Sequence, residues 1–455
     1  MDEKLTPPAI CAYLDEYIVG QEKAKKAVAV AMRNRWRASR LSAEESKEIT
    51  PKNILLIGPT GVGKTEIARR IAALTDAPFV KVEATKYTEV GYVGRDVESM
   101  VRDLVEEAIH IEKKREIERH GQAAEEAAVE KIGEIMWPTK KAETRNPMDI
   151  IFGKGGETTT EDVDPGKAER RAQFLERIRN GDLDNRTVEI EVVEKGRMNA
   201  MGANENMNQI SQMISTMMPK KTKKKKVTVR MAKKLLAEEA AEEMIDMDLA
   251  ADRAIQNAEE HGIIFIDEID KIACRGGNSG SPEVSREGVQ RDILPIVEGA
   301  TVNTKYGTVK TDHILFMAAG AFHVSKPSDL IPELQGRFAI RVELSSLGKE
   351  EFRKILTEPR QALIRQYRAL LSAEGVTLEF TEDALDAVAD IAHRVNSETE
   401  DIGARRLYTI LERVLEDVSY EASELTDKNV VIDAAYVREK MGDVTENIDI
   451  SHYIL

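Results

Sequence analysis

The octapeptide Gly58-Pro-Thr-Gly-Val-Gly-Lys-Thr65 is the feature that most constrains how this chain can fold. It fits G-x-x-x-x-G-K-[ST] in full, and it stands between an apolar run of strand type at residues 53–57 and a predicted helix at residues 65–74. In that setting the backbone N–H groups of the glycine turn and of the helix N-terminus form a cradle for phosphate groups. The pattern therefore predicts an α/β domain that binds a nucleoside triphosphate, rather than an ordinary glycine-rich turn.

The side chains expected around this cradle suit phosphoryl transfer. Lys64 would neutralise the β- and γ-phosphate oxygens, and Thr65 would hold Mg²⁺ through its hydroxyl. The apolar strand predicted at residues 263–266 delivers Asp267 and Glu268 at its carboxyl end. Asp267 would bind Mg²⁺ through water, and Glu268 would orient and deprotonate the attacking water, a role worth roughly 10²–10⁴-fold in rate. An Asp-Glu pair after an apolar run is common, but downstream of a complete phosphate-binding motif the catalytic interpretation is favoured.

Two arginines are candidates for the cation that phosphoryl transfer places at the γ-phosphate. Arg337 follows a glycine in Pro332-Glu-Leu-Gln-Gly-Arg-Phe338, and Arg405 opens a predicted helix in Ile402-Gly-Ala-Arg-Arg-Leu407. An arginine in the first turn opposes the helix dipole, so a nearby anion would compensate it. Considered alone, both positions are more typical of surface arginines.

A second glycine-flanked segment follows a predicted strand at residues 78–82. Here Gly91 and Gly94 enclose Tyr92 and Val93, and glycine on both sides takes the segment out of any helix or strand. We expect a mobile loop tip with apolar side chains, which is a liability on a soluble protein unless the loop has a use. The alternative is an aromatic side chain packed beneath a surface loop.

Composition divides the chain into three parts. We expect residues 1–110 and 255–344 to form one discontinuous nucleotide-binding domain. Residues 345–455 are expected to form a small, mainly helical domain with a tail. Residues 111–254 are expected to form an inserted, largely helical and partly flexible module. The remaining predicted strands lie at residues 188–192, 227–230 and 313–317.

Charge and cysteine content narrow the class of protein. The 455 residues carry a net charge of −15, with a pI of about 5.2, which argues against a generic nucleic-acid binder. The six lysines within residues 220–226 are therefore interpreted as a solvated charge run in a flexible loop. Cys11 and Cys274 are too far apart in sequence to predict a disulfide framework or a zinc site. Because no leader pattern and no apolar run of ~18 residues occurs, we expect a cytoplasmic protein without membrane contact.

With these motifs in this order, the chain resembles the AAA+ ATPases and, among them, the family of HslU (ClpY), the ATPase subunits of bacterial HslUV proteases. The resemblance covers the chain except much of the 111–254 insert. It is carried by Ile18-Val-Gly-Gln21, Gly58–Thr65, Gly91-Tyr-Val-Gly94, Asp267-Glu-Ile-Asp270, Val284-Ser-Arg-Glu-Gly-Val-Gln-Arg291, Leu334-Gln-Gly-Arg337, Gly403-Ala-Arg-Arg-Leu407 and Ile454-Leu455.

The resemblance implies a homohexameric ring with ATP and Mg²⁺ between subunits. Ile18 and Val19 would contact adenine, and Arg405 would sense the γ-phosphate from the small domain. Arg337 and Glu333 would approach the nucleotide of the neighbouring subunit. The residues that would wrap the phosphates are Gly61, Val62, Gly63, Lys64, Thr65 and Glu66.

The same resemblance implies that the 111–254 insert faces the substrate, and it implies two contacts with other proteins. Tyr92, with Gly91, Val93 and Gly94, would line a central pore and grip an unfolded or tagged polypeptide, while the glycines let the loop move with the nucleotide cycle. The final residues Tyr453, Ile454 and Leu455 would enter a pocket on an HslV-type peptidase ring.

Three alternatives stay open at this point. A ClpX-like unfoldase shares several motifs, but its family begins with a four-cysteine zinc domain that two distant cysteines cannot build. A nucleic-acid motor would use the lysine run, and a nucleotide-dependent scaffold without mechanical work would have little use for Glu268. The chain also departs from many AAA+ proteins after the strand at 313–317, where Ala318-Ala319-Gly320 stands in place of a polar sensor, so no sensor is assigned.

Overall fold

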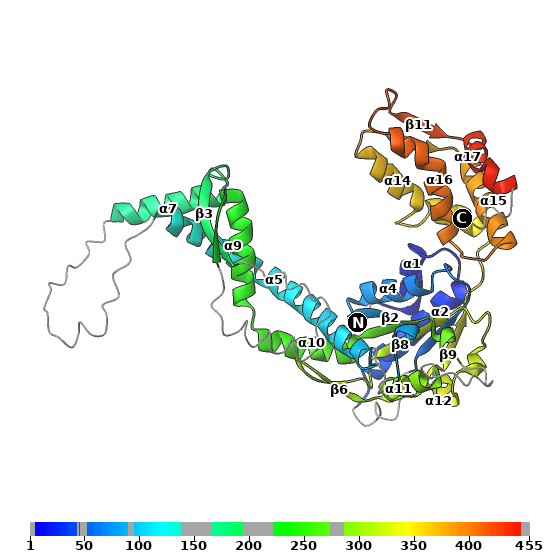
Figure 1. Ribbon diagram of the computed structural model, residues 1–455. Coiled ribbons are helices and arrows are strands. Elements are labelled where there is room, and N and C mark those ends of the chain that lie inside the picture. Colours follow the sequence, from blue (N-terminus) through cyan, green and yellow to red (C-terminus); the bar gives the residue numbers. More distant parts are fainter. Residues whose placement is uncertain are drawn as a thin grey trace. The chain divides into compact units, whose positions relative to one another are not determined.

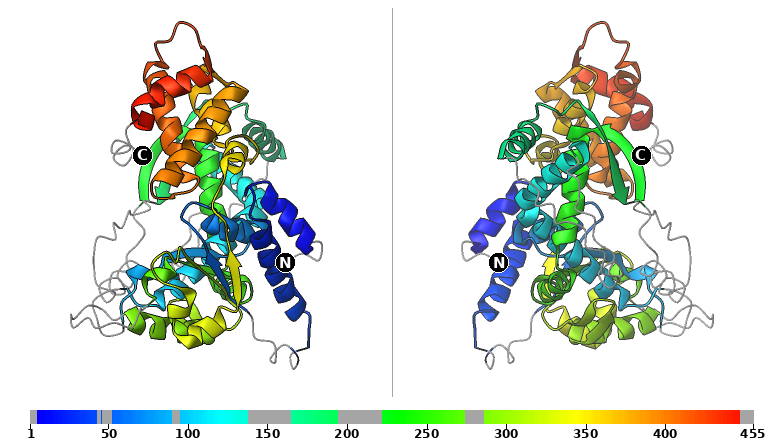
Figure 2. Two further views of the ribbon diagram at one scale, coloured as in Figure 1. Left: turned by 90° about the vertical axis from the view of Figure 1, so that its right-hand side faces the viewer. Right: turned by 90° about the vertical axis from the view of Figure 1, so that its left-hand side faces the viewer.

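The computed structural model describes residues 5–42, 45, 52–89, 95–137, 165–193, 222–273 and 286–446 (Figure 1). The chain divides into two compact units, one formed by Met1–Ile111 with Ala251–Leu455 and the other by Glu112–Ala250. Each unit is described by itself below, and Figure 2 gives two further views. Within the described ranges, no helix is both long and apolar enough to cross a membrane.

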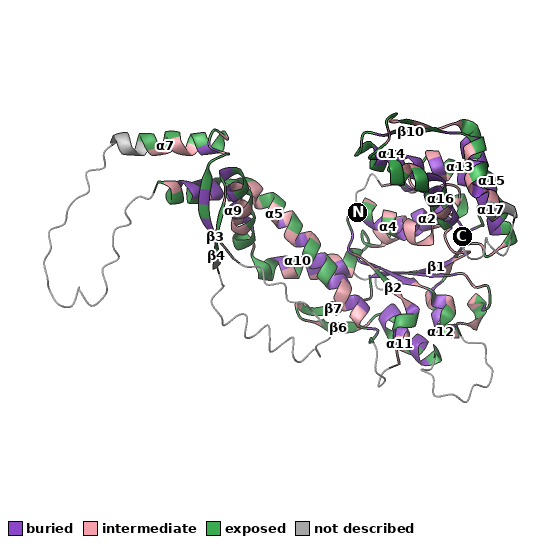
Figure 3. Cartoon of the chain, turned by 45° about the horizontal axis from the view of Figure 1, so that its top comes forward, coloured by how far each residue is buried: buried purple, intermediate pink, exposed green. Residues whose placement is uncertain are grey.

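The first unit is organised around a 5-stranded parallel sheet with the order β2-β5-β8-β1-β9. The three inner strands, β5, β8 and β1, are almost wholly buried, as expected for parallel strands with helices on both faces (Figure 3). The predicted α/β fold is therefore confirmed. The strands are β1 (Ile54–Ile57), β2 (Phe79–Glu83), β5 (Ile263–Asp267), β8 (Leu315–Gly320) and β9 (Ile340–Glu343).

Alternate side chains of this sheet enter two hydrophobic cores. Ile54 and Leu56 of β1 pack on one face with α1 (Pro7–Asp15), α2 (Glu22–Ala38) and α4 (Lys64–Thr75). Leu55 points to the other face. The helices on that face are α5 (Ser99–Met136), through its first turns, α10 (Met247–His261) and α11 (Arg286–Glu298).

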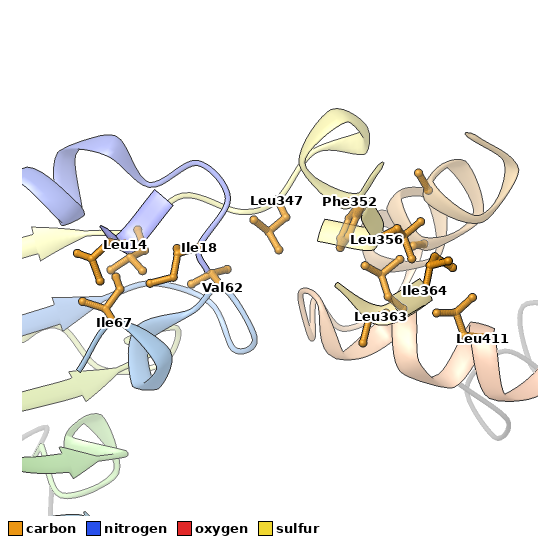
Figure 4. Close-up of a cluster of buried hydrophobic side chains, with 14 of the residues drawn as sticks. Leu14, Ile18, Val62, Ile67, Leu347, Phe352, Leu356, Leu363, Ile364 and Leu411 are labelled. Atoms are coloured by element: carbon orange, nitrogen blue, oxygen red, sulfur yellow. The ribbon is translucent and has the colours of Figure 1, made fainter. Parts of the chain in front are cut away.

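The C-terminal region of the first unit is mainly helical, as predicted. Its helices share the core that contains α1, α2 and α4, and Figure 4 shows Leu347 between the side chains of the sheet region and those of the C-terminal helices. The elements are α13 (Lys349–Thr357), α14 (Leu363–Ser372), α15 (Glu382–Glu398), α16 (Arg405–Glu421) and α17 (Ala434–Glu446), with the parallel strands β10 (Thr377–Phe380) and β11 (Asn429–Ile432).

Shorter elements complete this unit. Strands β6 (Thr301–Thr304) and β7 (Gly307–Lys310) form an antiparallel hairpin, and α12 (Pro332–Arg337) precedes β9. Three 3₁₀ turns are η1 (Ala84–Lys86), η2 (Ile269–Lys271) and η3 (Pro327–Asp329).

Predicted elements around the phosphate loop agree with the structure to within one residue at each end, but the strand predicted at 313–317 does not. Strand β8 begins at Leu315 and continues to Gly320, because it pairs with β1 up to the partners Ile57 and Gly320. Ala318, Ala319 and Gly320 therefore belong to the strand and do not follow it.

The second unit combines the later part of α5 with α7 (Pro165–Arg179), β3 (Thr187–Val193), β4 (Thr222–Thr228) and α9 (Val229–Met244). Ile132, Ile178 and Ile190 are fully buried in its core. The antiparallel pair β3–β4 corrects two predictions. The second strand, predicted at residues 227–230, begins at Thr222 and ends at Thr228. The side chain of Thr228 accepts from the N–H of Met231 and caps α9.

The other correction concerns the lysine run. Lys223–Lys226 lie in β4 rather than in a flexible loop, although their side chains are exposed, as a solvated run requires. The pairing places Lys224 opposite Glu191, with the ammonium 3.7 Å from the carboxylate, and Lys226 opposite Glu189. Opposite charges across strands stabilise the pair.

Candidate nucleotide site

The phosphate loop connects the carboxyl end of β1 to the first turn of α4. Gly61 (φ 75) and Gly63 (φ 102) have positive φ, a conformation that costs glycine little. Gly63 is the N-cap of α4, and no side chain caps this first turn. Its N–H groups are therefore oriented toward the loop, as an anion-binding helix terminus requires.

Lys64 is partly buried inside this loop. Its ammonium donates hydrogen bonds to the carbonyl oxygens of Gly58 and, at 2.6 Å, of Pro59. Burial lowers the pKa of Lys64, and the Arg405 charge lowers it further, while Asp267 and Asp270 act in the opposite direction. Asp267, Asp270 and Arg405 therefore lie near enough to Lys64 for their charges to act on it.

Asp267 is held by a partner that the sequence analysis missed. Its Oδ2 is 2.7 Å from the Nζ of Lys81, and its Oδ1 accepts from the N–H of Glu268 at 3.0 Å. Lys81 lies on β2, the neighbour of β5 in the sheet. The signal available in the sequence was a lysine in the middle of an otherwise apolar strand.

Glu268 follows Asp267 with an exposed side chain and φ 56. A left-handed backbone is uncommon in residues other than glycine, and such conformations cluster at active sites. Its carboxylate therefore reaches solvent at the edge of the sheet where the phosphate loop lies, which is the position a base for an attacking water needs.

The end of β8 packs directly against Asp270. A Cβ on Gly320 would lie 2.8 Å from Asp270 Oδ1 and 2.7 Å from the Phe322 ring. Asp270 Oδ2 also accepts from the N–H of Phe322 at 3.4 Å. Position 320 therefore has no room for a side chain.

The segment expected to contact adenine lies beside the phosphate loop. Ile18 is buried and packs with Val62, and a Cβ on Gly63 would lie 3.7 Å from its Cγ2 (Figure 4). Val19 is partly buried. Ile18 therefore has the apolar surroundings that a nucleobase requires.

Arg405 begins α16, as predicted, and the turn before it touches the phosphate loop backbone to backbone. The N–H of Ala404 donates to the carbonyl of Gly61 at 3.1 Å. A Cβ on Gly61 would lie 2.0 Å from the carbonyl oxygen of Ile402, and one on Gly403 (φ 58) would lie 2.6 Å from the carbonyl carbon of Gly61. Glycine at both positions allows this approach.

The buried side chain of Arg406 holds that turn in place, a role that the sequence analysis did not assign. Its Nε donates to Asn396 Oδ1, and its Nη2 donates to Thr399 Oγ1 and to the Glu400 carbonyl, each at 3.0 Å. Asn396 in turn donates to the carbonyl of Gly403 at 3.2 Å. Of the two adjacent arginines, Arg406 is thus structural, whereas the side chain of Arg405 is exposed.

Arg337 is not brought to the phosphate loop of its own chain. It ends α12 at the amino end of the sheet, where its carbonyl accepts from the N–H of Asn53 at 3.4 Å. Its guanidinium lies 3.0 Å from Glu298 Oε1. The phosphate loop follows the opposite end of β1, and Glu333 is exposed on the same short helix as Arg337.

Thr65 and Glu66 lie in the first turn of α4, where Glu66 forms ion pairs with Arg69 at 3.0 Å and with Arg70 at 2.6 Å. In the described part of the chain, no group of three or more histidine, cysteine, aspartate or glutamate side chains could hold a metal ion alone. Thr65 and Asp267 suit Mg²⁺, which is commonly held by one or two protein oxygens together with phosphates and water.

Two predicted sites fall outside the described residues. They are the loop formed by Gly91, Tyr92, Val93 and Gly94, and the terminal Tyr453, Ile454 and Leu455.

Comparison with known proteins gives matches along the whole chain. Three family models match, described as "ATPase family associated with various cellular activities (AAA)" at residues 54–131, "AAA domain (Cdc48 subfamily)" at 186–341 and "C-terminal, D2-small domain, of ClpB protein" at 347–429. The ATP-dependent protease ATPase subunit HslU of Persephonella marina is 55% identical, covering 100% of this chain and 99% of that protein. The subunit named ClpY in Bacillus subtilis is 53% identical over 100% of both chains.

Proposed function

The chain belongs to the HslU/ClpY family of ATP-dependent protease ATPase subunits, and we propose that it hydrolyses ATP to unfold protein substrates and deliver them to an HslV-type peptidase. The observation that carries this proposal is that the phosphate loop and Asp267 lie at the carboxyl ends of β1 and β5, at one edge of the same parallel sheet, and that the turn before Arg405 is hydrogen-bonded to Gly61 of that loop. Relatives match this chain over its full length. The unfoldase is favoured over a ClpX-like protein, a nucleic-acid motor or a passive scaffold.

Within one subunit, each residue has a defined task. The N-terminus of α4 and Lys64 hold the phosphates, and Thr65 with Asp267 would hold Mg²⁺, which supplies positive charge to the phosphate oxygens. Glu268 orients the attacking water and takes its proton. Ile18 and Val19 provide the adenine contact. Lys81 is a positioning residue, because it fixes the carboxylate of Asp267.

Arg337 and Glu333 act on the nucleotide of a neighbouring copy in a homohexamer. This proposal is supported by the position of Arg337 at the edge of the sheet opposite its own phosphate loop. An arginine supplied from a neighbour stabilises transition-state charge and is worth about 10³–10⁵ in kcat in well-studied phosphoryl-transfer systems.

The substrate and the peptidase are contacted by the two segments outside the described residues. The loop at Gly91–Gly94 would grip unfolded polypeptide in the central pore, and the tail ending in Tyr453, Ile454 and Leu455 would dock on the peptidase. A free carboxylate beside apolar side chains suits capture by backbone donors, and several tails on one ring act together through effective concentration. The low cysteine content suits a reducing compartment, and we propose the cytoplasm.

A subunit-mixing experiment tests the proposed ring. Lys64→Thr should bind ATP at least tenfold more weakly, and Arg337→Ala should bind ATP but hydrolyse it poorly, so that each variant alone is nearly inactive. Mixed rings should recover part of the wild-type turnover, because some interfaces pair an intact Lys64 with an intact Arg337 from the neighbour. Absence of recovery in rings shown to be mixed would place Arg337 in the chemistry of its own subunit.

A tail deletion tests the proposed peptidase contact. Removal of residues 453–455 should leave ATP hydrolysis within about twofold, because the tail takes no part in the chemistry, and should abolish activation of the peptidase. A synthetic peptide of residues 445–455 should activate the peptidase partly at high concentration. Full activation by the truncated protein would refute docking through the tail.

A further inference from the structure

A cavity of ≈ 780 Å³ lies at the amino ends of the central strands, the edge of the sheet opposite the phosphate loop. Its walls come from the end of α2, from Lys52 before β1, from His313 before β8, and from the end of α10. Apolar side chains form much of the lining: Ala31, Met32, Trp36, Leu41 and Ile340.

Two hydrogen-bond donors in this lining lack a partner. Arg35 uses Nη2 to donate to the carbonyl oxygens of His313 and, at 3.4 Å, of Glu260. Its Nη1 is buried and has no hydrogen-bond partner in the described residues, and the same holds for the indole Nε1 of Trp36. A buried donor without a partner costs about 1–3 kcal/mol, and more when it is charged.

The cavity is also short of negative charge. No carboxylate of the described residues forms an ion pair with Arg35, and burial lowers the pKa of Arg35 to about 10. Arg37, Arg40 and Lys52 add exposed cations to the lining, in which Glu260 is the one acid among the described residues. An unpaired charge is costly inside a protein unless an ion of opposite sign accompanies it.

We propose that this cavity binds a small oxyanion, a carboxylate or a phosphate, carried on an aromatic or apolar body. The cations of the lining attract the anion, and the body packs against Met32, Leu41 and Ile340. The volume lies in the range of about 300–1,000 Å³ that ligand pockets occupy. The site is separate from the nucleotide site, since it lies at the other end of β1.

The indole that borders the cavity is well fixed. The guanidinium of Arg33 lies 3.6 Å from the centre of the Trp36 ring, and that of Arg40 lies at 5.3 Å. Cations over an aromatic face hold the ring by electrostatic attraction. Trp36 is therefore a natural fluorescent reporter for this cavity.

The test uses that reporter in the full-length chain. The sequence contains two tryptophans, Trp36 and Trp137, so Trp137→Phe leaves one fluorophore. Lys64→Thr in the same protein removes phosphate binding at the nucleotide site. Inorganic phosphate, phenyl phosphate and benzoate are titrated while Trp36 emission is followed. We expect saturable changes with all three, and at least tenfold tighter binding of the two aromatic probes than of inorganic phosphate, because the ring adds apolar burial.

Matched variants locate the binding. Arg35→Gln should raise the dissociation constant for phenyl phosphate at least tenfold. Arg413→Gln, which removes an exposed arginine paired with Glu416 at 2.9 Å, should leave it unchanged. Lys52→Gln changes an exposed lining residue without risk to the fold, and it should weaken binding twofold to threefold and reduce its salt dependence. Circular dichroism verifies that each variant is folded.

Three outcomes would overturn the proposal. The first is no saturable emission change with any probe. The second is binding that survives both Arg35→Gln and Lys52→Gln unaltered. The third outcome uses protein with intact Lys64, assembled on a non-hydrolysable ATP analogue. It is a change in Trp36 emission on assembly without any probe, together with loss of probe binding by the assembled protein. That last result would mean that a second copy of the chain fills the cavity.

Discussion

The contact between Gly403 and the phosphate loop makes a quantitative prediction. In Gly403→Ala, the new Cβ would lie 2.6 Å from the carbonyl carbon of Gly61, whereas an ordinary contact begins at 3.4 Å. The turn that carries Arg405 must therefore retreat by about 0.8 Å (3.4 − 2.6). Misplacement of a catalytic group by about 1 Å costs on the order of 10²-fold in rate. We expect kcat for ATP hydrolysis to fall tenfold to a hundredfold.

The C-terminal region offers a matched control. Gly375 also has positive φ (78, against 58 for Gly403), but a Cβ there meets no atom within 4 Å. Each alanine variant should lose roughly 1–2 kcal/mol of unfolding free energy from the left-handed backbone. Gly375→Ala should nevertheless keep kcat within about twofold, because it leaves the phosphate loop untouched.

Three measurements separate these effects. Urea unfolding compares the stability of both variants, calorimetry with a non-hydrolysable ATP analogue measures affinity, and steady-state kinetics gives kcat. Affinity should stay within about threefold in both, since Lys64 and the N-terminus of α4 remain in place. Equal turnover by Gly403→Ala and Gly375→Ala would refute the reasoning that this contact positions Arg405.

Four further variants have expected outcomes. Lys64→Thr should weaken ATP binding at least tenfold by calorimetry. Glu268→Gln should bind ATP normally and lose hydrolysis. Turnover by Glu268→Gln within about twofold of wild type would exclude Glu268 as the base. Gly320→Ala should lower the free energy of unfolding by about 1–3 kcal/mol in urea and reduce hydrolysis, because its Cβ displaces Asp270; unchanged stability would show that this packing is loose. Tyr92→Ala should keep ATP hydrolysis and lose unfolding of a stable tagged protein. Equal loss of both activities would indicate that Tyr92 is a core residue and not a pore residue.

The sequence could predict the phosphate loop because its constraints are local. Gly61 and Gly63 occupy positive φ, and the apolar run before them and the helix after them agree with the structure to within one residue. These features depend on backbone sterics and on periodicity over about twenty residues. Neighbouring residues along the chain are enough to specify them.

Local composition failed where a partner strand decides the conformation. Lys223–Lys226 read as a loop because lysine is depleted in strands. The pairing of β4 with β3 overrides that tendency, since it sets lysines opposite glutamates and buries Ile190 of the same hairpin. Likewise β8 reaches Gly320 because β1 continues beside it.

Side-chain partners far apart in sequence were decided by the tertiary structure alone. Lys81 meets Asp267 because β2 and β5 are neighbours in the sheet, and Gly403 meets Gly61 because the C-terminal helices share a core with α4. In the same way, Arg35 of α2 donates through Nη2 to the carbonyls of Glu260, in α10, and His313, just before β8. These contacts leave its Nη1 without a partner. Strand order and helix packing set these distances, and each depends on cores assembled from many distant residues, so no short stretch of sequence contains the information.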